Sequence, residues 1–155
     1  NRTVLARSGG RVFFTATEGA TGYELWSVPV PLKLHTITPC RIADTREATG
    51  PTGGAPLGSS ETVIVQVTGR CGIPPTALSI AANVTVVSPS ATGSLSVFAG
   101  GPVLSGSTEV PVSAGRTRAL HFLPGLGTAG SLSFRPSLQA GGSTDVILDV
   151  SGWFE

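Results

Sequence analysis

The stretch that decides the fold is residues 61–68, ETVIVQVT, in which valine occupies every second position from 63 to 67. This period of two places Val63, Val65 and Val67 on one face of an extended strand. Residues 79–88, SIAANVTVVS, form a more continuously apolar run that is typical of a buried central strand. Both stretches therefore predict β structure, and glycine, proline or serine residues bound each of them.

The rest of the chain repeats this kind of pattern. Glycine or proline interrupts nearly every window longer than about ten residues, and apolar residues do not recur at helical spacing. Additional strands are expected at residues 3–7, 11–17, 23–28, 32–38, 41–45, 94–99, 108–112, 118–123, 131–135 and 145–150. Many short strands at this spacing predict an all-β fold, either an antiparallel β-sandwich or a small, jelly-roll-like barrel.

Residues 1–31 differ in character from residues 32–155. Aromatic residues are frequent in the first part, at Phe13, Phe14, Tyr23 and Trp26. The sequence Pro29-Val30-Pro31 predicts a joint, since proline cannot donate to a sheet ladder. We therefore expect an N-terminal strand extension over residues 1–31 and a sandwich domain over residues 32–155. Three strands cannot form a stable core alone, so the extension must pack on its own domain or on a neighbouring molecule.

The composition restricts the class of protein. The chain has 155 residues and a net charge of +1, and only 12% of its residues are charged. Its arginines are scattered singly, so the basic stripe of a nucleic-acid-binding protein is absent. No apolar run approaches the length of a membrane span. Low charge with abundant serine, threonine and glycine is typical of secreted proteins, and we expect an extracellular or cell-surface location.

The chain contains two cysteines, Cys40 and Cys71, and two histidines, His35 and His121. Their spacing does not match a metal-ligand motif, so we expect neither a metal nor a cofactor. In a chain of secreted character a disulfide is favoured over two free thiols. In the chain-entropy treatment such a cross-link stabilises the fold by about 3–4 kcal/mol.

The densest group of charges is Arg41, Asp44 and Arg46. One interpretation is a site for an anion or a sugar carboxylate. The other is a structural ion pair that ties a strand end to the loop after it, and we favour this one. On a regular strand Asp44 and Arg46 share a face with Ile42, whereas Arg41 points the other way.

The remaining paired carboxylates are Asp145 and Asp149, which alternate with apolar residues near the C-terminus. Calcium binding and acid/base chemistry are the functional interpretations. We favour strand-edge or arginine-paired acids, because the rest of a calcium loop is missing. No Gly-x-Ser-x-Gly elbow is present, and we expect no enzymatic activity. Asn1-Arg2-Thr3 has the form of an N-glycosylation sequon, which makes Asn1 a candidate glycan site.

Three motifs follow one another across residues 34–155: TPCRIADTR, GRCGIPPTALSIAANVTVV and DVILDVSGWF. Together they resemble a repeat domain of uncharacterised bacterial surface proteins, whose pattern is PxRxxDTR, CGIP, NVTV and DVxGxF in the same order. The resemblance implies an extracellular, β-rich domain, often near the C-terminus of large secreted chains, with no known enzymatic activity. It also implies that Cys40 pairs with Cys71, because the first two motifs carry these cysteines.

A second resemblance covers residues 10–26, GRVFFTATEGATGYELW. Gly22, Glu24, Leu25 and Trp26 are similar to the ELWxxDGT repeat of large secreted bacterial proteins. Ser27-Val28-Pro29 replaces the Asp-Gly-Thr turn, so the segment resembles the last, incomplete unit of such an array. A single stacking repeat cannot bury its own apolar face.

These observations predict a structural subunit of an extracellular bacterial assembly. The N-terminal extension would add as a strand to a neighbour's sheet edge and build a filament head to tail. Its expected anchors are Val12, Phe13, Phe14, Tyr23, Leu25 and Trp26. The alternatives are a carbohydrate-binding or adhesive module of a larger surface protein, and a plain spacer. The expected partners are accordingly other copies of the chain, neighbouring domains of the same surface protein, or glycans.

Overall fold

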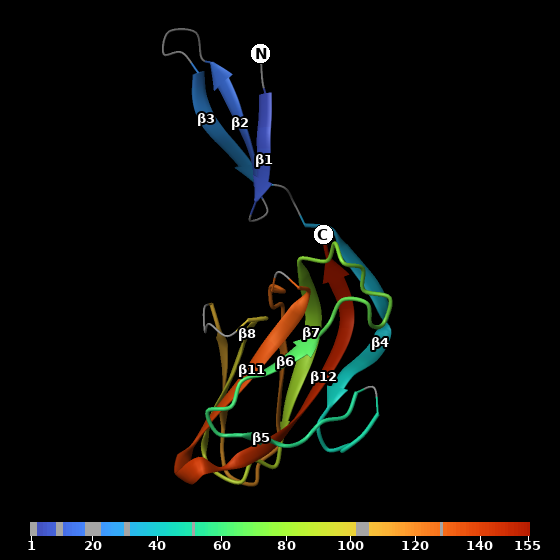
Figure 1. Cartoon of the computed structure of the whole chain (residues 1–155), viewed down its shortest axis with the longest axis vertical. Helices are drawn as coiled ribbons and strands as arrows, with labels where there is room; N and C mark the ends of the chain where they lie inside the picture. The colour runs from blue at the N-terminus through green and yellow to red at the C-terminus, as the bar shows by residue number, and fades with distance from the viewer. Residues whose placement is uncertain are drawn as a thin grey trace. The chain divides into compact units, whose positions relative to one another are not determined.

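The structure is a computed structural model that describes residues 3–8, 11–17, 23–29, 32–50, 52–101, 106–127 and 129–155, with the backbone only at residues 3–8, 12 and 17. Contacts divide the chain into two units, Asn1–Lys33 and Leu34–Glu155 (Figure 1). Within the described ranges the regular elements are strands and one short 3-10 helix, η1 (Gln139–Gly141). The predicted all-β fold is therefore confirmed.

The N-terminal unit is a three-stranded antiparallel sheet of β1 (Thr3–Ser8), β2 (Arg11–Thr17) and β3 (Tyr23–Pro29). β2 lies between the other two strands and pairs with all of β3. The register sets Phe14 opposite Trp26 and Thr15 opposite Leu25. Because successive side chains on a strand point to opposite faces, Leu25 and Trp26 lie on opposite faces of this sheet.

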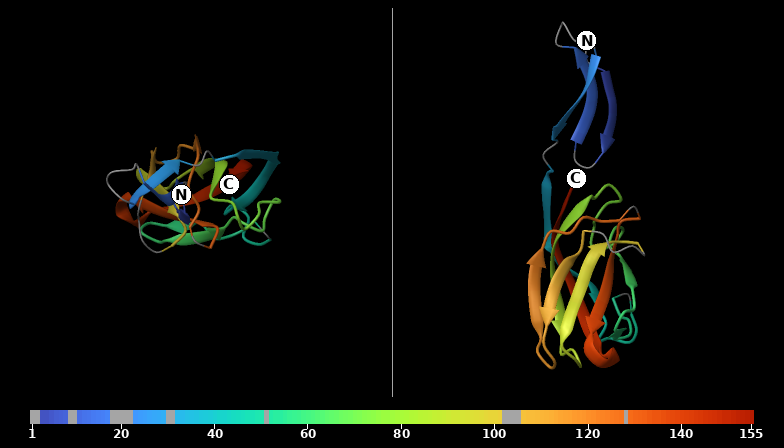
Figure 2. Two further views of the ribbon diagram at one scale, coloured as in Figure 1. Left: turned by 90° about the horizontal axis from the view of Figure 1, so that it is seen from above. Right: turned by 90° about the vertical axis from the view of Figure 1, so that its left-hand side faces the viewer.

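The second unit is a sandwich of two antiparallel sheets packed face to face (Figures 1 and 2). Its strands are β4 (Leu34–Asp44), β5 (Leu57–Gly58), β6 (Val63–Gln66), β7 (Ser79–Val87), β8 (Gly93–Ala99), β9 (Thr108–Val112), β10 (Arg118–Phe122), β11 (Ser131–Leu138) and β12 (Ser143–Phe154). One sheet has the order β10-β7-β12-β4, with β5 paired to β12, and the other has the order β6-β11-β8-β9. This alternation of strands between two sheets is a jelly-roll topology, and it confirms the predicted antiparallel sandwich.

The hydrophobic core lies between the inner faces of the two sheets. β7 is a central strand, as its apolar run predicts, and it contributes Ile80, Ala82, Val84 and Val86. The facing sheet contributes, among others, Leu95, Val97, Leu132 and Phe134. The buried cluster is drawn entirely from residues 42–150, so the sandwich has a core of its own.

β4 departs from expectation. Two separate strands are expected at residues 32–38 and 41–45, but the structure joins them in one. Pro39 is accommodated because it lies in an irregularity of this edge strand, where residues 37–39 stand opposite Ser151 alone and a missing N–H breaks no ladder bond. A β-bulge interrupts the register at Ile42: Ala43 pairs with Leu148 and Arg41 pairs with Asp149, so Ile42 is the extra residue.

The C-terminal strand is also longer than the expected residues 145–150, since β12 continues to Phe154. Trp153 packs partly buried against the core. The imidazole of His35 stacks on its indole, with ring centroids 4.0 Å apart and an interplanar angle of 5°. This stacked pair joins the beginning of β4 to the end of β12.

Candidate functional site

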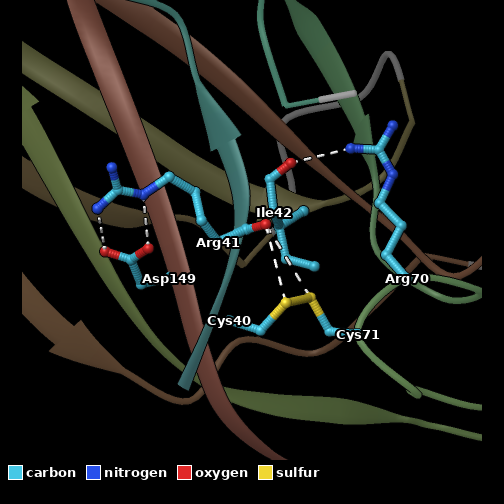
Figure 3. The surroundings of a disulfide bond; sticks show 6 residues. All are labelled: Cys40, Arg41, Ile42, Arg70, Cys71 and Asp149. Atoms are coloured by element: carbon cyan, nitrogen blue, oxygen red, sulfur yellow. Dashed lines mark hydrogen bonds and ion pairs between the residues drawn. A yellow bond between two sulfur atoms is a disulfide. The ribbon is translucent and has the colours of Figure 1, made fainter. Parts of the chain in front are cut away.

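The two cysteines form a disulfide beside the outer edge of β4 (Figure 3). Cys40 belongs to β4, Cys71 belongs to the loop after β6, and their Cα atoms are 6.0 Å apart. The predicted disulfide is therefore confirmed. Disulfides are stable in oxidising compartments and rare in the cytosol, so this bond indicates a non-cytoplasmic protein.

Two hydrogen bonds cover the same edge. Arg70 donates from Nη1 to the carbonyl oxygen of Ile42 at 2.9 Å (Figure 3), and the amide of Asp44 donates to the carbonyl oxygen of Thr52 at 2.7 Å. A bulge leaves its extra residue outside the regular ladder, and Arg70 supplies the carbonyl of this residue with a donor. The disulfide and the two loops thus occupy an edge that another strand could otherwise pair with.

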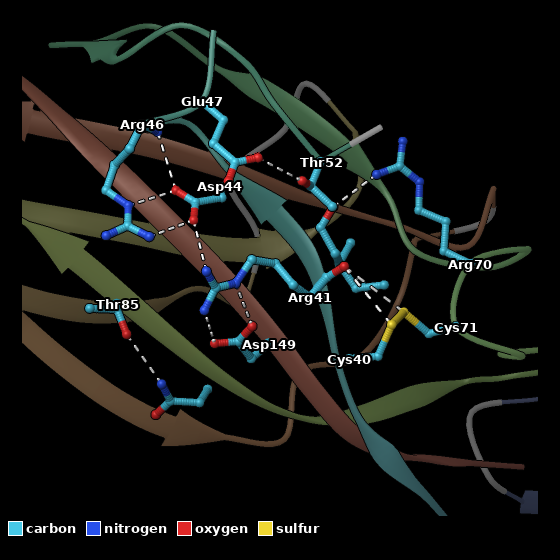
Figure 4. Close-up of polar contacts among 12 residues, drawn as sticks. Cys40, Arg41, Asp44, Arg46, Glu47, Thr52, Arg70, Cys71, Thr85 and Asp149 are labelled. Carbon is cyan, nitrogen blue, oxygen red and sulfur yellow. Dashed lines mark hydrogen bonds and ion pairs between the residues drawn. A yellow bond between two sulfur atoms is a disulfide. The ribbon is translucent and has the colours of Figure 1, made fainter. Parts of the chain in front are cut away.

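Asp44 is the centre of an ion network at the end of β4 (Figure 4). Its side chain is fully buried. Oδ2 accepts hydrogen bonds from Arg46 Nη2 at 2.6 Å and from Arg41 Nη1 at 2.8 Å, and Oδ1 accepts one from Arg46 Nε at 2.8 Å. The hydrogen bonds from Arg46 and the charges of both arginines lower the pKa of Asp44 from 3.8 to about 2, although burial acts in the opposite direction.

Arg41 connects this network to β12. It donates from Nε and Nη2 to the two carboxylate oxygens of Asp149, at 2.9 and 3.2 Å. This bidentate pair is the first cause of the raised pKa of Arg41. The expectation that Arg41 points away from Asp44 is wrong, because the bulge at Ile42 shifts the alternation by one residue. Both side chains therefore meet on one face of the sheet.

Asp145, the other carboxylate of β12 considered as a site residue, accepts a hydrogen bond from Thr45 Oγ1 at 2.9 Å. The positive charges of Arg41 and Arg46 thus balance the negative charges of Asp44 and Asp149. The hydrogen bond from Thr45 also ties the loop after β4 to β12. Buried charges are stable when they are paired and hydrogen-bonded in this way. The geometry fits the structural interpretation of the cluster, with no unpaired carboxylate left at its centre.

A groove of about 450 Å³ lies between β4 and β6, one edge strand from each sheet, and residues 52–56 of the loop after β4 also line it. We call it the β4–β6 groove. Its apolar lining includes Ile42, Ala43, Val63 and Val65. The charged side chains that line it are Arg70 and Glu61, among the residues that the structure describes. Nothing in the sequence pattern indicates this groove, because β4 and β6 face each other only through the order of the two sheets.

The expected partner-binding residues of β3 are exposed. Tyr23 is 70% and Leu25 is 67% exposed, and they share one face of the sheet. Trp26 and Val28, which are 38% and 47% exposed, share the other face. The N-terminal sheet therefore presents apolar side chains on both faces. Because Tyr23 and Trp26 point in opposite directions, they do not form one stacking platform for a sugar.

The other predicted residues of this unit lie on β2 or at the N-terminus. Phe13 and Phe14 are partly buried within the N-terminal unit. Val12 is opposite Val28 in the register, but its side chain lies outside the described residues, as does Asn1 with its sequon. Phe14 is on the same face of the sheet as Trp26, its cross-strand neighbour.

No protein-family model matches this chain, and no curated protein matches its sequence significantly. In the described ranges no group of three or more histidine, cysteine, aspartate or glutamate residues is placed to hold a metal ion. The described part of the chain also contains no helix that is long and apolar enough to cross a bilayer.

Proposed function

We propose that this protein is a structural subunit of an extracellular bacterial assembly, in which the N-terminal sheet attaches one copy to the next. The observation that carries the proposal is the exposure of apolar side chains on both faces of that sheet, with Leu25 at 67% and Trp26 at 38%. A sheet of three strands is stable when a hydrophobic face is packed against something. A neighbouring subunit provides such a surface.

The sandwich is suited to the part of a rigid scaffold. It has its own core, a disulfide that holds the edge of β4, and a paired ion network between β4 and β12. These features stabilise residues 34–155 without any contribution from the N-terminal strands. The disulfide and the resemblance to bacterial surface repeats support an extracellular location.

The proposed contact joins two different surfaces, the N-terminal sheet of one copy and the sandwich of another. A contact of this head-to-tail type leaves a free surface at each end, so it propagates into a filament unless the rotation closes a ring. The proposed role of the filament is that of a continuous mechanical support, and it involves no catalytic step.

Light scattering of the intact chain over a range of concentrations tests the proposal, with negative-stain microscopy of the same samples. We expect the mean mass to rise with concentration, and a fragment of residues 34–155 to stay monomeric. The double variant Leu25→Ser with Trp26→Ser should also stay monomeric, whereas Leu123→Ser, at a 59% exposed leucine of the sandwich, should associate like the wild type. An intact chain that is monomeric at its highest accessible concentration would refute the proposed function.

A further inference from the structure

Among the described strands of the sandwich, and apart from the two-residue β5 that pairs with β12, four lie at a sheet edge, and three of these four are protected against pairing with another strand. The disulfide and the hydrogen bond from Arg70 cover β4. β9 contains Glu109 and Pro111, and β10 begins with the exposed Arg118. Charged residues, proline and covering loops are the means by which proteins prevent edge-to-edge association. Because three edges are protected, an unprotected fourth edge indicates a surface at which another strand is added.

The fourth edge is β6, and among the described residues no disulfide or arginine hydrogen bond ties a loop to it, although residues 52–56 of the loop after β4 lie across the groove from it. Its sequence VIVQ contains no charge and no proline, and in the described part of the chain it pairs only with β11. Ile64 on this strand is 56% exposed. An uncharged edge strand with an exposed isoleucine is a template for an added strand.

The β4–β6 groove runs beside this unprotected edge. Val63 and Val65 of β6 line it together with Ile42 and Ala43 of β4, so apolar side chains lie beside the free edge. Its volume of about 450 Å³ is within the range of about 300–1,000 Å³ that is typical of binding pockets. An added strand gains affinity from main-chain hydrogen bonds, while its alternate side chains fill pockets beside the edge. β6 and the groove provide both elements.

We propose that β6 and the β4–β6 groove are the acceptor for strand β3 of a second copy of this chain. This inference rests on the proposed function and specifies where the N-terminal sheet attaches. β3 is itself an edge strand, since among the described strands it pairs only with β2. Pairing of the two edges joins the N-terminal sheet of one copy to the β6-β11-β8-β9 sheet of the next. One of the two apolar faces of β3 then covers the groove.

One charge on each surface can form a complementary pair. Glu24 is the carboxylate of β3, and Arg11 is an exposed cation on the adjacent strand. The groove is lined by a cation and a carboxylate, Arg70 and Glu61. Glu24 shares the face of Trp26 and Val28, whereas Arg11 is opposite Pro29 and lies on the other face with Leu25. When the Trp26 face covers the groove, Glu24 is the charge that it presents, and Arg70 is the cation of the groove lining that has the opposite sign.

A chain-terminator experiment tests the inference. A fragment of residues 34–155 carries the acceptor but no N-terminal sheet, so it binds the growing end and stops elongation. We expect light scattering to show that added wild-type fragment shortens the assemblies of the intact chain. The fragment with Ile64→Lys, which introduces a protective charge on the edge, should bind the intact chain at least tenfold more weakly. Leu123→Lys removes a comparably exposed apolar side chain (59% against 56%) elsewhere on the sandwich and should terminate like the wild type.

Thermal melts of the three fragments show whether each is folded. Their effects on assembly are compared only between fragments that have equal melting temperatures. If Ile64→Lys fails to fold, Ile64→Thr is the substitute, because it removes apolar surface and retains a β-branched strand residue. If the intact chain associates but the Ile64 and Leu123 variants terminate equally well, the acceptor assignment is overturned and the proposed function stands. If the intact chain does not associate at all, the proposed function fails and this inference fails with it.

Discussion

An Asp44→Asn substitution keeps the shape of the side chain and removes the charge that Arg41 and Arg46 share. One pKa unit corresponds to about 1.4 kcal/mol, so the lowering of the Asp44 pKa from 3.8 to about 2 corresponds to about 2 kcal/mol of folding free energy. The two guanidinium groups remain in contact with water, with side chains 42% and 48% exposed. The loss therefore stays below the roughly 3–5 kcal/mol that follows when a fully buried charge loses its partner.

The pH dependence of this effect has a definite sign. The folded-state pKa of Asp44 is depressed, so its stabilisation is fully present above the unfolded-state pKa and is lost as the pH falls towards about 2. We expect urea unfolding at pH 7 to show Asp44→Asn to be about 2 kcal/mol less stable than the wild type. Between pH 4 and pH 2 this difference should shrink towards zero.

Asp149→Asn is the matched control, because Asp149 has one arginine partner and a side chain that is 35% exposed. Exposed ion pairs contribute about 0–1 kcal/mol, so this variant should lose less free energy of unfolding than Asp44→Asn. A loss below about 0.5 kcal/mol for Asp44→Asn at pH 7, or a difference from wild type that does not change down to pH 2, would refute the reasoning from the buried network.

The remaining predictions concern the covered edge and the turns. Replacing Cys40 and Cys71 together with serine should lower the free energy of unfolding by about 3–4 kcal/mol, because the bond closes a loop with a sequence separation of 31; an unchanged urea midpoint would contradict this. Arg70→Ala removes the donor to the Ile42 carbonyl and should destabilise by about 1 kcal/mol in the same assay, whereas Arg116→Ala in an exposed turn should have no measurable effect. Gly130 and Gly115 have the same left-handed conformation, with φ of +69° and +68°, but an added Cβ would collide with Thr68 only at Gly130. Gly115→Ala should therefore destabilise by about 1–2 kcal/mol and Gly130→Ala by more, and equal calorimetric losses would show that the contact with Thr68 is unimportant.

Most strands could be predicted from the sequence because their signals are local. Residues 108–112 are bounded by turn residues, and β9 begins and ends at the predicted positions. The apolar run at residues 79–88 correctly indicates a central strand, since β7 is covered on both sides by neighbours. The order of the strands could not be predicted, because it depends on pairings such as β12 with both β4 and β7, which join distant parts of the chain.

The candidate sites also consist of features with a local sequence signal and features that depend on long-range strand pairing. The cluster of Arg41, Asp44 and Arg46 is visible because its members are close in sequence, but its connection to Asp149 follows from the register of β4 on β12. The orientation of Arg41 depends on the bulge at Ile42. A prediction that assumes strict alternation of side chains along a strand cannot locate such a bulge. Arg70 lies beside a cysteine, and this adjacency is the one local signal that could have drawn attention to it.

The two proposed contact surfaces, on β3 and on β6, share a sequence signal, which is a pair of adjacent apolar residues within a strand. Neighbouring residues on a strand point to opposite faces, so an apolar pair such as Leu25-Trp26 or Val63-Ile64 needs cover on both sides. In β12 the pair Ile147-Leu148 has this cover and is buried. In β3 and β6 it does not, and Leu25 and Ile64 are 67% and 56% exposed. Departures from local patterning that the fold does not compensate are expected at functional positions. If Ile64→Thr lowered the stability of the isolated sandwich by more than about 1 kcal/mol, the value of a buried methyl group or more, the pair would have a structural explanation and the case for an interface at β6 would weaken.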